Sequence, residues 1–407
     1  MKYRDLIITK IQKFFQTDLS YVIKHGQWLL GNNLISSAIS FFMALAFANL
    51  LPKYDYGIYQ YVLSMAALLA IPTLSGINTS FARAVAQGKE GDYYSTLRTK
   101  IKWSFIGTTA SLVFSLYYFF VNNNLLGTGF LIVALAIPLG DTFSHYVSFL
   151  HGKKLFSKVA IYEIVNQFIV TVALIVTLFF TDSIISLLFV YFSFWIIVRI
   201  FSYYKVGHEY KPNKITDPEV IKYGKHLTVN NIISTISSSL DKVLIWHFLG
   251  PVEVSVYIFS MTIPSKVSGF LKIMNRLAFP KFSQHENFNH SLILKKILKV
   301  ILFIIPIYLV YFFVVPVFFN LFLHQYTDSI PYAQALGLIF LFQPVYLILT
   351  YLTAQNKLKD LYIYNLLSPI FRIVMFLIFI PLYGIWGAVI TTIASKIIDS
   401  IILIRIR

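Results

Sequence analysis

The chain has no cysteine and little charge. None of its 407 residues is a cysteine, which excludes disulfides, thiolate metal sites and cysteine nucleophiles. Charged residues make up only 13% of the sequence, roughly half the share typical of a soluble domain. The patterns GxxxxGK[ST], GxSxG and HExxH are absent, so we expect no nucleotide site, no metal and no cofactor. Any energy that the protein uses must then come from an ion gradient or from the concentration gradient of its own substrate.

Long apolar segments occupy most of the sequence. Hydrophobic residues make up 57% of the chain. Windows of about 20 apolar residues are long enough to cross a bilayer as helices. They predict an all-α integral membrane protein with 12 transmembrane helices, over 28–51, 57–79, 103–121, 126–149, 159–180, 184–203, 226–249, 254–277, 298–320, 331–352, 361–381 and 385–404.

Basic residues predict the orientation of these helices. They precede the first window and follow each even-numbered one, as Lys89 and Lys100 follow the second, whereas the other loops contain one basic residue, Lys53. Because Lys and Arg of short loops stay on the cytoplasmic side, both termini are predicted to be cytoplasmic. The same bias explains the net charge of +17 without a nucleic-acid partner and predicts contact with anionic membrane lipids.

The first membrane helix recurs half-way along the chain. Residues 26–59 align with 224–257 at a constant offset of 198, and 9 of the 34 positions are identical. Six spans in each half make the repeat parallel, with a pseudo-two-fold axis along the membrane normal. We therefore expect two six-helix lobes around a central cavity. The N-terminal lobe covers 1–203, a cytoplasmic inter-lobe loop covers 204–225, and the C-terminal lobe covers 226–407.

We single out cationic residues that lie deep in predicted membrane helices of the second half: Lys266, Arg372 and Lys396 are near the midpoints of their helices, and Lys242 is in the outer part of its helix. An ionisable side chain near the bilayer centre costs at least ~2.5 kcal/mol and is rarely kept without a use. A cationic second lobe facing an uncharged, hydroxyl-lined and amide-lined first lobe suits an anionic headgroup such as a diphosphate.

Internal salt bridges are the alternative explanation for these cations. Asp399 follows Lys396 by three residues and lies on the same helix face, and Asp241 is within reach of Lys266 across two helices. The adjacent pair Asp241 and Lys242 diverges by about 100° and is not expected to pair. Lys242 and Arg372 then have no evident partner.

A polar stripe is repeated in both halves. Asn32 and Ser36 are one turn apart on the first helix, and Asn230 and Ser234 hold the same places on the seventh. In hydrocarbon such a face must turn toward another helix or a water-filled cavity. It either faces a water-filled lumen or joins helices to one another.

Two basic residues match at the inner mouth of the two halves. Arg83 and Lys281 share the offset of 198 and either guide an anionic headgroup into the cavity or anchor helix ends at the interface. Three further polar residues lie in or near predicted spans 4 and 5. Asp141 and His145 share a face of the fourth span, and Glu163 enters the fifth. They either carry a coupling ion or form internal pairs.

Two segments resemble a known family. Leu50 to Gln87 reads LLPKYDYGIYQYVLSMAALLAIPTLSGINTSFARAVAQ, and Leu240 to Ser283 reads LDKVLIWHFLGPVEVSVYIFSMTIPSKVSGFLKIMNRLAFPKFS. Both are similar to segments of the Wzx-type polysaccharide flippases, which belong to the multidrug/oligosaccharidyl-lipid/polysaccharide exporter superfamily. The resemblance implies a two-lobed bundle with a central cavity and cationic residues that hold the lipid carrier.

The resemblance also implies an activity and its partners. It points to outward movement of undecaprenyl-diphosphate-linked oligosaccharide across a bacterial inner membrane, for O-antigen or capsule assembly. A polysaccharide polymerase and a chain-length regulator are the implied protein partners. A drug/cation antiporter of the same superfamily is the first rival. A membrane glycan polymerase or ligase is the second, but the longest outer loop, near 321–330, offers only His324 and Asp328, so we do not expect an enzyme.

Overall fold

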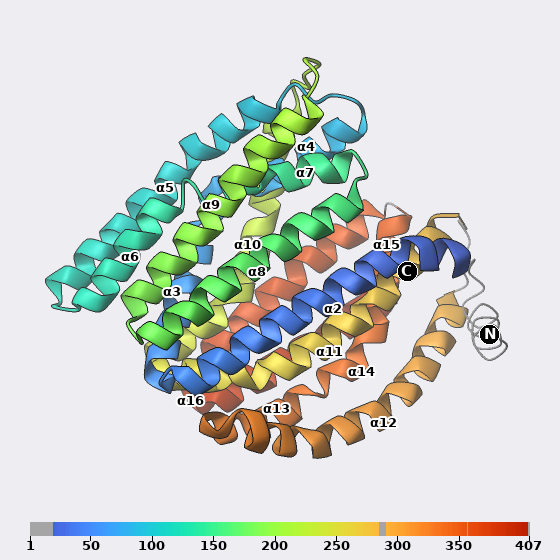
Figure 1. The fold of residues 1–407 in the computed structure, drawn as a ribbon. Coiled ribbons are helices and arrows are strands. Elements are labelled where there is room, and N and C mark those ends of the chain that lie inside the picture. The colour runs from blue at the N-terminus through green and yellow to red at the C-terminus, as the bar shows by residue number, and fades with distance from the viewer. Residues whose placement is uncertain (1–18, 285–289, 356, 406–407) are drawn as a thin grey trace, which may run out of the picture.

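The computed structural model describes residues 19–284, 290–355 and 357–405, and every regular element among them is a helix. The long helices run side by side along one direction in a single bundle (Figure 1). The elements of the first half are α2 (Leu19–Leu50), α3 (Lys53–Leu69), η1 (Ile71–Thr73), α4 (Gly76–Ala86), α5 (Tyr93–Phe120), α6 (Asn124–Ala136), η2 (Thr142–Ser144), α7 (His145–Gly152), α8 (Phe156–Phe180) and α9 (Ile184–Tyr210).

The second half follows the α9–α10 loop. Its elements are α10 (Val220–Phe248), α11 (Pro251–Gln284), α12 (His290–Phe322), η3 (His324–Ser329), α13 (Ile330–Leu336), α14 (Ile339–Phe342), η4 (Gln343–Val345), α15 (Tyr346–Ala354) and α16 (Leu358–Arg405). The register of the sequence repeat reappears in these bounds. The ends of α2 and α10 differ by 198 residues, and so do the starts of α3 and α11.

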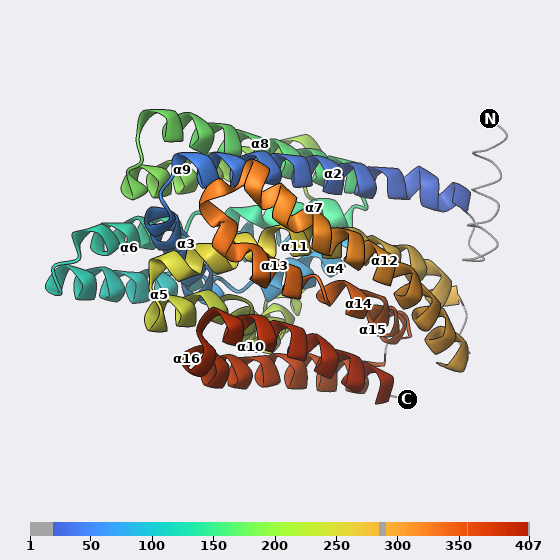
Figure 2. The same ribbon diagram turned by 90° about the horizontal axis from the view of Figure 1, so that it is seen from below.

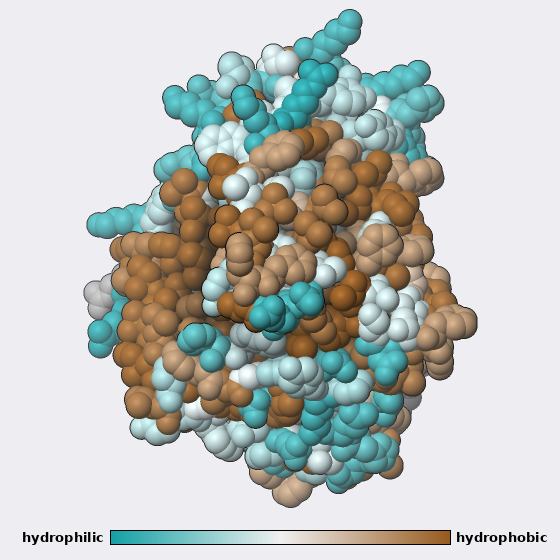
Figure 3. All heavy atoms as spheres, turned by 90° about the vertical axis from the view of Figure 1, so that its left-hand side faces the viewer, coloured by the Kyte–Doolittle hydropathy of each residue, from teal (hydrophilic) through white to brown (hydrophobic). Residues whose placement is uncertain are grey.

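Eight helices in the described part of the chain are long and apolar enough to cross a membrane, or nine if α3 and η1–α4 form one bent crossing. Apolar side chains also cover much of the surface, and hydrophilic groups gather at the top and bottom of the view in Figure 3. The chain is therefore a multi-pass membrane protein, as its hydrophobic windows predict.

Three windows predicted as continuous helices are broken in the structure. The second is bent by 43° between α3 and the η1–α4 segment, the fourth is interrupted between α6 and α7, and the tenth between α13 and α15. Each break contains a proline, at Pro72, Pro138 and Pro344. Proline lacks the N–H of the helix ladder and clashes with the preceding turn, so it ends or kinks a helix.

The last two predicted windows form one helical hairpin, α16. Its backbone leaves the helical region at Gly384 (φ 59°, ψ −135°), three residues after Pro381. A Cβ on Gly387 would lie 1.9 Å from the carbonyl oxygen of Phe379, so the two limbs pack back against each other at this point. Only glycine permits so close an approach of two backbones.

Helices of the two halves pack tightly against each other. The second-half helix α10 lies against α3 and α4, and α11 lies along α3. A Cβ on Gly76 would stand 2.3 Å from the carbonyl oxygen of Gly224, and the Gly76 N–H donates to Thr228 Oγ1 over 3.0 Å. Aromatic side chains continue the contact, since the rings of Tyr56 and Phe259 lie 5.0 Å apart.

The predicted inter-lobe loop is shorter than expected and is docked. Helices α9 and α10 extend into 204–225 and leave 211–219 irregular. The Gly91 N–H donates to the Ile215 carbonyl over 2.8 Å, and the Asp217 N–H donates to Asp92 Oδ2 over 2.7 Å. Lys89 pairs with Asp217 over 3.2 Å. We call the end of the bundle formed by loops 87–92, 153–155 and 211–219 the basic-loop end, and the opposite end, with loops 51–52, 249–250 and 323, the short-loop end.

Candidate functional site

Lys266 lines a cavity between the halves. The cavity measures about 250 Å³ and lies between α2 and α11; we call it the α2–α11 cavity. Lys266 of α11 is partly buried there and forms no ion pair with the described residues. Asn33 and Ser36 of α2 line the same cavity. A single cation thus stands across a small space from hydroxyl and amide groups, which is a suitable setting for an anionic group.

The polar stripe of α2 partly lines a cavity and partly contacts a neighbouring helix. Ser36 lines the α2–α11 cavity, as a substrate-facing stripe requires. Ser40, one turn further on, joins helices, because Gln167 of α8 donates to its Oγ over 2.7 Å and to the Ser36 carbonyl over 3.0 Å. The side chain of Asn32 lies outside the described residues.

The corresponding stripe of α10 is placed differently. Asn230 and Ser234 are exposed and line neither of the two cavities described here. Asn230 reaches the Tyr362 hydroxyl of α16 over 3.5 Å. The residues of α10 that face a cavity are offset by one position, at Asn231 and Thr235.

Arg372 has a partner, contrary to the sequence expectation. Its NH2 group lies 3.9 Å from Asp241 Oδ2, so Asp241 pairs with Arg372 and not with Lys266. The reason is that α10 packs closely against α16, and the Tyr257 hydroxyl of α11 also holds this carboxylate by donating to it over 3.0 Å. The pair is long, and the Arg372 Nε is buried without a hydrogen-bond partner among the described residues. Adjacent Lys242 is partly buried and forms no ion pair within the described ranges.

Lys396 is held by an internal pair, as its spacing predicts. Its Nζ lies 3.5 Å from Asp399 Oδ2 and donates to the Tyr346 hydroxyl over 2.9 Å. The Tyr346 hydroxyl in turn donates to the same Asp399 oxygen over 2.6 Å. This closed triangle satisfies most of the hydrogen-bonding capacity of Lys396.

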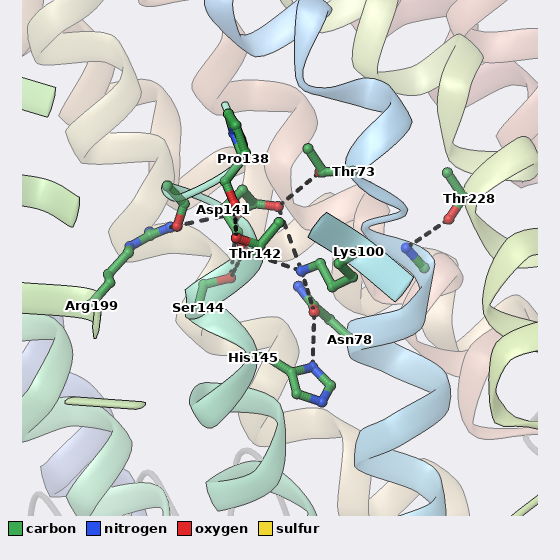
Figure 4. Close-up of polar contacts among 12 residues, drawn as sticks. Thr73, Asn78, Lys100, Pro138, Asp141, Thr142, Ser144, His145, Arg199 and Thr228 are labelled. Atoms are coloured by element: carbon green, nitrogen blue, oxygen red, sulfur yellow. Dashed lines mark hydrogen bonds and ion pairs between the residues drawn. The ribbon is translucent and has the colours of Figure 1, made fainter. Parts of the chain in front are cut away.

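The first half is not uncharged, which corrects the expectation of a neutral first lobe. Asp141 lies between two cations, 3.9 Å from Lys100 Nζ and 3.6 Å from Arg199 NH1 (Figure 4). Lys100 is fully buried, although its position after the second window suggested a cytoplasmic loop residue. It belongs to α5, which begins at Tyr93, ten residues before the predicted window. Arg199 lies inside the predicted window 184–203, so the sequence alone could have identified it as a charge within a membrane helix.

Asp141 and His145 do not pair with each other in the described structure. The break between α6 and α7 separates them, and His145 Nε2 contacts Thr96 Oγ1 over 2.7 Å. The two residues connect indirectly through Asn78 and Lys100 (Figure 4). Lys100 Nζ donates to Asn78 Oδ1 over 2.9 Å and to the Asp141 carbonyl over 3.1 Å.

A second, larger cavity adjoins Asp141. It measures about 340 Å³, and we call it the α9–α10 cavity. Its walls come from α3 and η1, from the end of α6 and the following break, from α9 and from α10. The polar side chains that line it are those of Thr73, Ser75, Asp141, Tyr191, Trp195, Thr228, Asn231 and Thr235.

Arg83 and Glu163 line neither of the two cavities. Arg83 is exposed near the basic-loop end with its guanidinium 5.4 Å from the Tyr223 ring centre, and the side chain of Lys281 is outside the described residues. Glu163 is exposed on α8, and the neighbouring Lys158 lies 3.6 Å from Glu209. Within the described ranges, no group of three or more His, Asp or Glu side chains is arranged to hold a metal ion.

Comparisons with known proteins agree with this architecture. The family model described as polysaccharide biosynthesis protein matches residues 22–286. The fold resembles that of the lipid II flippase MurJ in an inward closed conformation, with a TM-score of 0.74 and 15% identity over 94% of this chain and 86% of MurJ. It also resembles an inward-facing multidrug resistance MATE family transporter of the MOP superfamily, with a TM-score of 0.60 and 12% identity over 90% and 92% of the two chains. The fold is also similar to that of a eukaryotic MATE transporter, AtDTX14, with a TM-score of 0.61 and 12% identity over 93% of each chain. No curated protein sequence matched.

Proposed function

The chain belongs to the polysaccharide biosynthesis protein family, and we propose that it is a flippase for undecaprenyl-diphosphate-linked oligosaccharides. It moves the repeat units of an O-antigen or capsular polysaccharide from the cytoplasmic to the periplasmic leaflet of a bacterial inner membrane. A polysaccharide polymerase and a chain-length regulator receive the product. The fold shared with a lipid II flippase and with MATE transporters supports transport by alternating access rather than catalysis.

The observation that carries this proposal is the setting of Lys266. Its ammonium group lies in a cavity between the halves, opposite Asn33 and Ser36, with no carboxylate among the described residues to neutralise it. An unpaired charge inside a membrane protein is costly and marks a substrate or ion pathway. We propose that the Lys266 ammonium group is the first contact of the substrate's diphosphate.

The other predicted cations differ in how far they are available to contact an anion. Arg372 keeps a buried Nε without a hydrogen-bond partner in the described part of the chain and only a long contact to Asp241, so it can turn donors toward an anion. Lys242 is partly buried on the same helix as Asp241. Lys396 is bound by Asp399 and Tyr346 and adds positive potential more than direct contacts. In this proposal Asn32 and Ser36 meet the sugars from α2, and Asn230 and Ser234 meet them from the exposed face of α10, outside the two described cavities. Arg83 and Lys281 attract the headgroup at the entrance.

The proposed topology has twelve crossings in two six-helix lobes, over 1–203 and 226–407. The hairpin of α16 supplies two crossings, and each broken helix supplies one. The beginning of α2 and the end of α16 lie at the same end of the bundle (Figures 1 and 2). At the basic-loop end, Lys153 also pairs with Glu90 of a neighbouring loop. The gathering of basic loops at one end supports a cytoplasmic location for that end and for both termini.

The MATE-like fold makes a drug/cation antiporter the alternative. Such a transporter needs a carboxylate that is free to bind an organic cation. Here the carboxylates of Asp141, Asp241 and Asp399 each have a cation beside them. Asp141 adjoins Lys100 and Arg199, Asp241 adjoins Arg372, and Asp399 adjoins Lys396. This arrangement favours an anionic or neutral substrate.

Complementation tests the proposal in cells. A bacterium that lacks its own lipid-linked glycan flippase is given the wild-type chain, Lys266→Ala or Lys266→Arg. We expect surface glycan with the wild type, at least about a tenfold loss with Lys266→Ala, and partial rescue with Lys266→Arg, because the charge is what binds. Lys222→Ala is the matched control, since Lys222 is exposed near the start of α10. Normal glycan in Lys266→Ala cells would refute the assignment.

A further inference from the structure

We propose that the α9–α10 cavity is a subsite that binds one sugar ring of the transported glycan. This inference rests on the proposed function. It adds a second contact region to the anion site at Lys266, built from different helices, and it assigns a role to Asp141, Asn231 and Trp195 that the charge pattern of the sequence does not indicate.

The polar groups of the cavity suit hydroxyl groups. Asn231 is exposed on the cavity side of α10, and its amide forms no hydrogen bond with the described residues. One amide offers both a donor and an acceptor to adjacent hydroxyls. Asp141 faces it from the break between α6 and α7, with 35% of its side chain exposed. Thr235 adds a third polar group one turn after Asn231.

An aromatic wall supplies the complementary surface, and the Arg199 guanidinium lies over the Trp195 ring, 3.8 Å from its centre. Tyr191 and Trp195 stand one turn apart on α9, with ring planes 14° apart and centres separated by 6.2 Å. Phe192 also lines the cavity. A sugar ring carries C–H groups on its faces and hydroxyls around its edge, so it fits a site with aromatic rings on one side and amide or carboxylate groups on the other.

The charges around Asp141 disfavour cationic ligands. Lys100 Nζ at 3.9 Å and Arg199 NH1 at 3.6 Å give the cluster a net charge of +1, counted over these three residues. An organic amine or a metal cation entering the cavity meets two positive charges for one negative charge. The exposed carboxylate oxygens can still accept hydrogen bonds from neutral hydroxyls.

The position of the cavity connects binding to movement. Its volume of about 340 Å³ lies at the lower end of the range for ligand sites, ~300–1,000 Å³, and matches a small ring rather than a whole oligosaccharide. Asn231 comes from the second half, whereas Asp141 and Trp195 come from the first. Rocking of one half against the other would therefore change the contacts of a sugar ring held between these residues.

Binding to the purified full-length chain tests the subsite. The probes are undecaprenyl diphosphate alone and the same lipid carrying glucose, galactose or N-acetylglucosamine, with affinity measured in detergent. We expect at least one sugar-bearing probe to bind roughly tenfold more tightly than the bare lipid. The double variant Asn231→Ala/Thr235→Val should remove this gain and leave the affinity for the bare lipid unchanged. Val229→Ala is the control, since Val229 is 62% exposed on α10 and lines neither cavity.

Tryptophan fluorescence gives an independent readout. The probe that gains affinity should change the emission of the wild type and not that of Trp195→Phe. Equal affinity of the wild type for every sugar-bearing probe and for the bare lipid would overturn the subsite while the flippase proposal stands. Failure to bind any of these lipids would count against the proposed function itself. A gain that survives in the double variant would also overturn the subsite.

Discussion

Individual charged side chains differ mainly in whether a neighbour compensates them. Lys396, Arg372 and Lys100 each have a carboxylate nearby, whereas Lys266 has none among the described residues. A cation with a partner is compensated inside the protein, whereas a cation without one has its whole charge to offer to a ligand. Spacing along one helix predicts the first kind well, as for Lys396 and Asp399. It does not predict pairs between helices, such as Arg372 with Asp241.

The Lys100–Asp141–Arg199 cluster gives an asymmetric prediction for stability. Asp141→Asn leaves two neighbouring cations without a carboxylate, whereas Lys100→Met leaves one balanced pair, Asp141 with Arg199. Breaking a fully buried pair costs about 3–5 kcal/mol, and the cost is smaller here because Asp141 is 35% exposed. We expect Asp141→Asn to lower the thermal midpoint of the detergent-purified protein more than Lys100→Met does. The reverse order would contradict this reading of the cluster.

Among the elements, the helix breaks were the feature that hydropathy windows did not predict. A window of about 20 apolar residues scores the same whether its helix is continuous or broken, so 57–79 and 126–149 read as plain spans. Pro72 and Pro138 were visible in the sequence, but proline is tolerated in membrane helices when neighbours satisfy the freed groups. The repeat was the opposite case, since its offset of 198 recurs in the helix bounds.

The hairpin of α16 depends on a glycine at its closest approach. Gly387→Ala places a Cβ 1.9 Å from the Phe379 carbonyl oxygen, and overpacking of this kind costs about 1–3 kcal/mol. We therefore expect a clear fall in the thermal midpoint, although alanine is the better helix former. Gly31→Ala in α2 is the matched control, because a Cβ there meets no atom of the described residues within 4 Å. Equal midpoints for the two variants would show that the limbs do not pack this closely.

At the scale of the whole molecule, contacts join the halves at both ends. Lys53 pairs with Asp328 over 2.7 Å at the short-loop end, where Asn49 Nδ2 also donates to the Phe322 carbonyl over 3.1 Å. At the basic-loop end the loop 211–219 is docked on 87–92. The sequence predicted two related halves and the loop between them. It did not predict these contacts, because they join residues more than 100 positions apart.

The docked loop has a predicted pH dependence. Hydrogen bonds from the backbone N–H of Glu219 and from Lys89 hold the pKa of Asp217 below its ordinary value of 3.8. A lowered pKa means that the contact is fully present above pH 3.8 and is lost as the pH falls through the folded-state pKa. Hydrogen exchange of 211–219 should thus be constant between pH 5 and 8 after correction for intrinsic rates, and Asp217→Asn should speed it at neutral pH. Unchanged protection in Asp217→Asn would contradict the role of this carboxylate.

Movement of a lipid-linked glycan through the α2–α11 cavity is the central claim, and reconstitution tests it most directly. The purified chain is placed in vesicles of bacterial lipids with a fluorescent undecaprenyl-diphosphate-linked oligosaccharide, and the appearance of the probe in the opposite leaflet is followed. We expect movement with the wild type, at least about a tenfold slower rate with Lys266→Ala, and partial recovery with Lys266→Arg. A wild-type rate equal to that of protein-free vesicles, or an undiminished rate with Lys266→Ala, would contradict it.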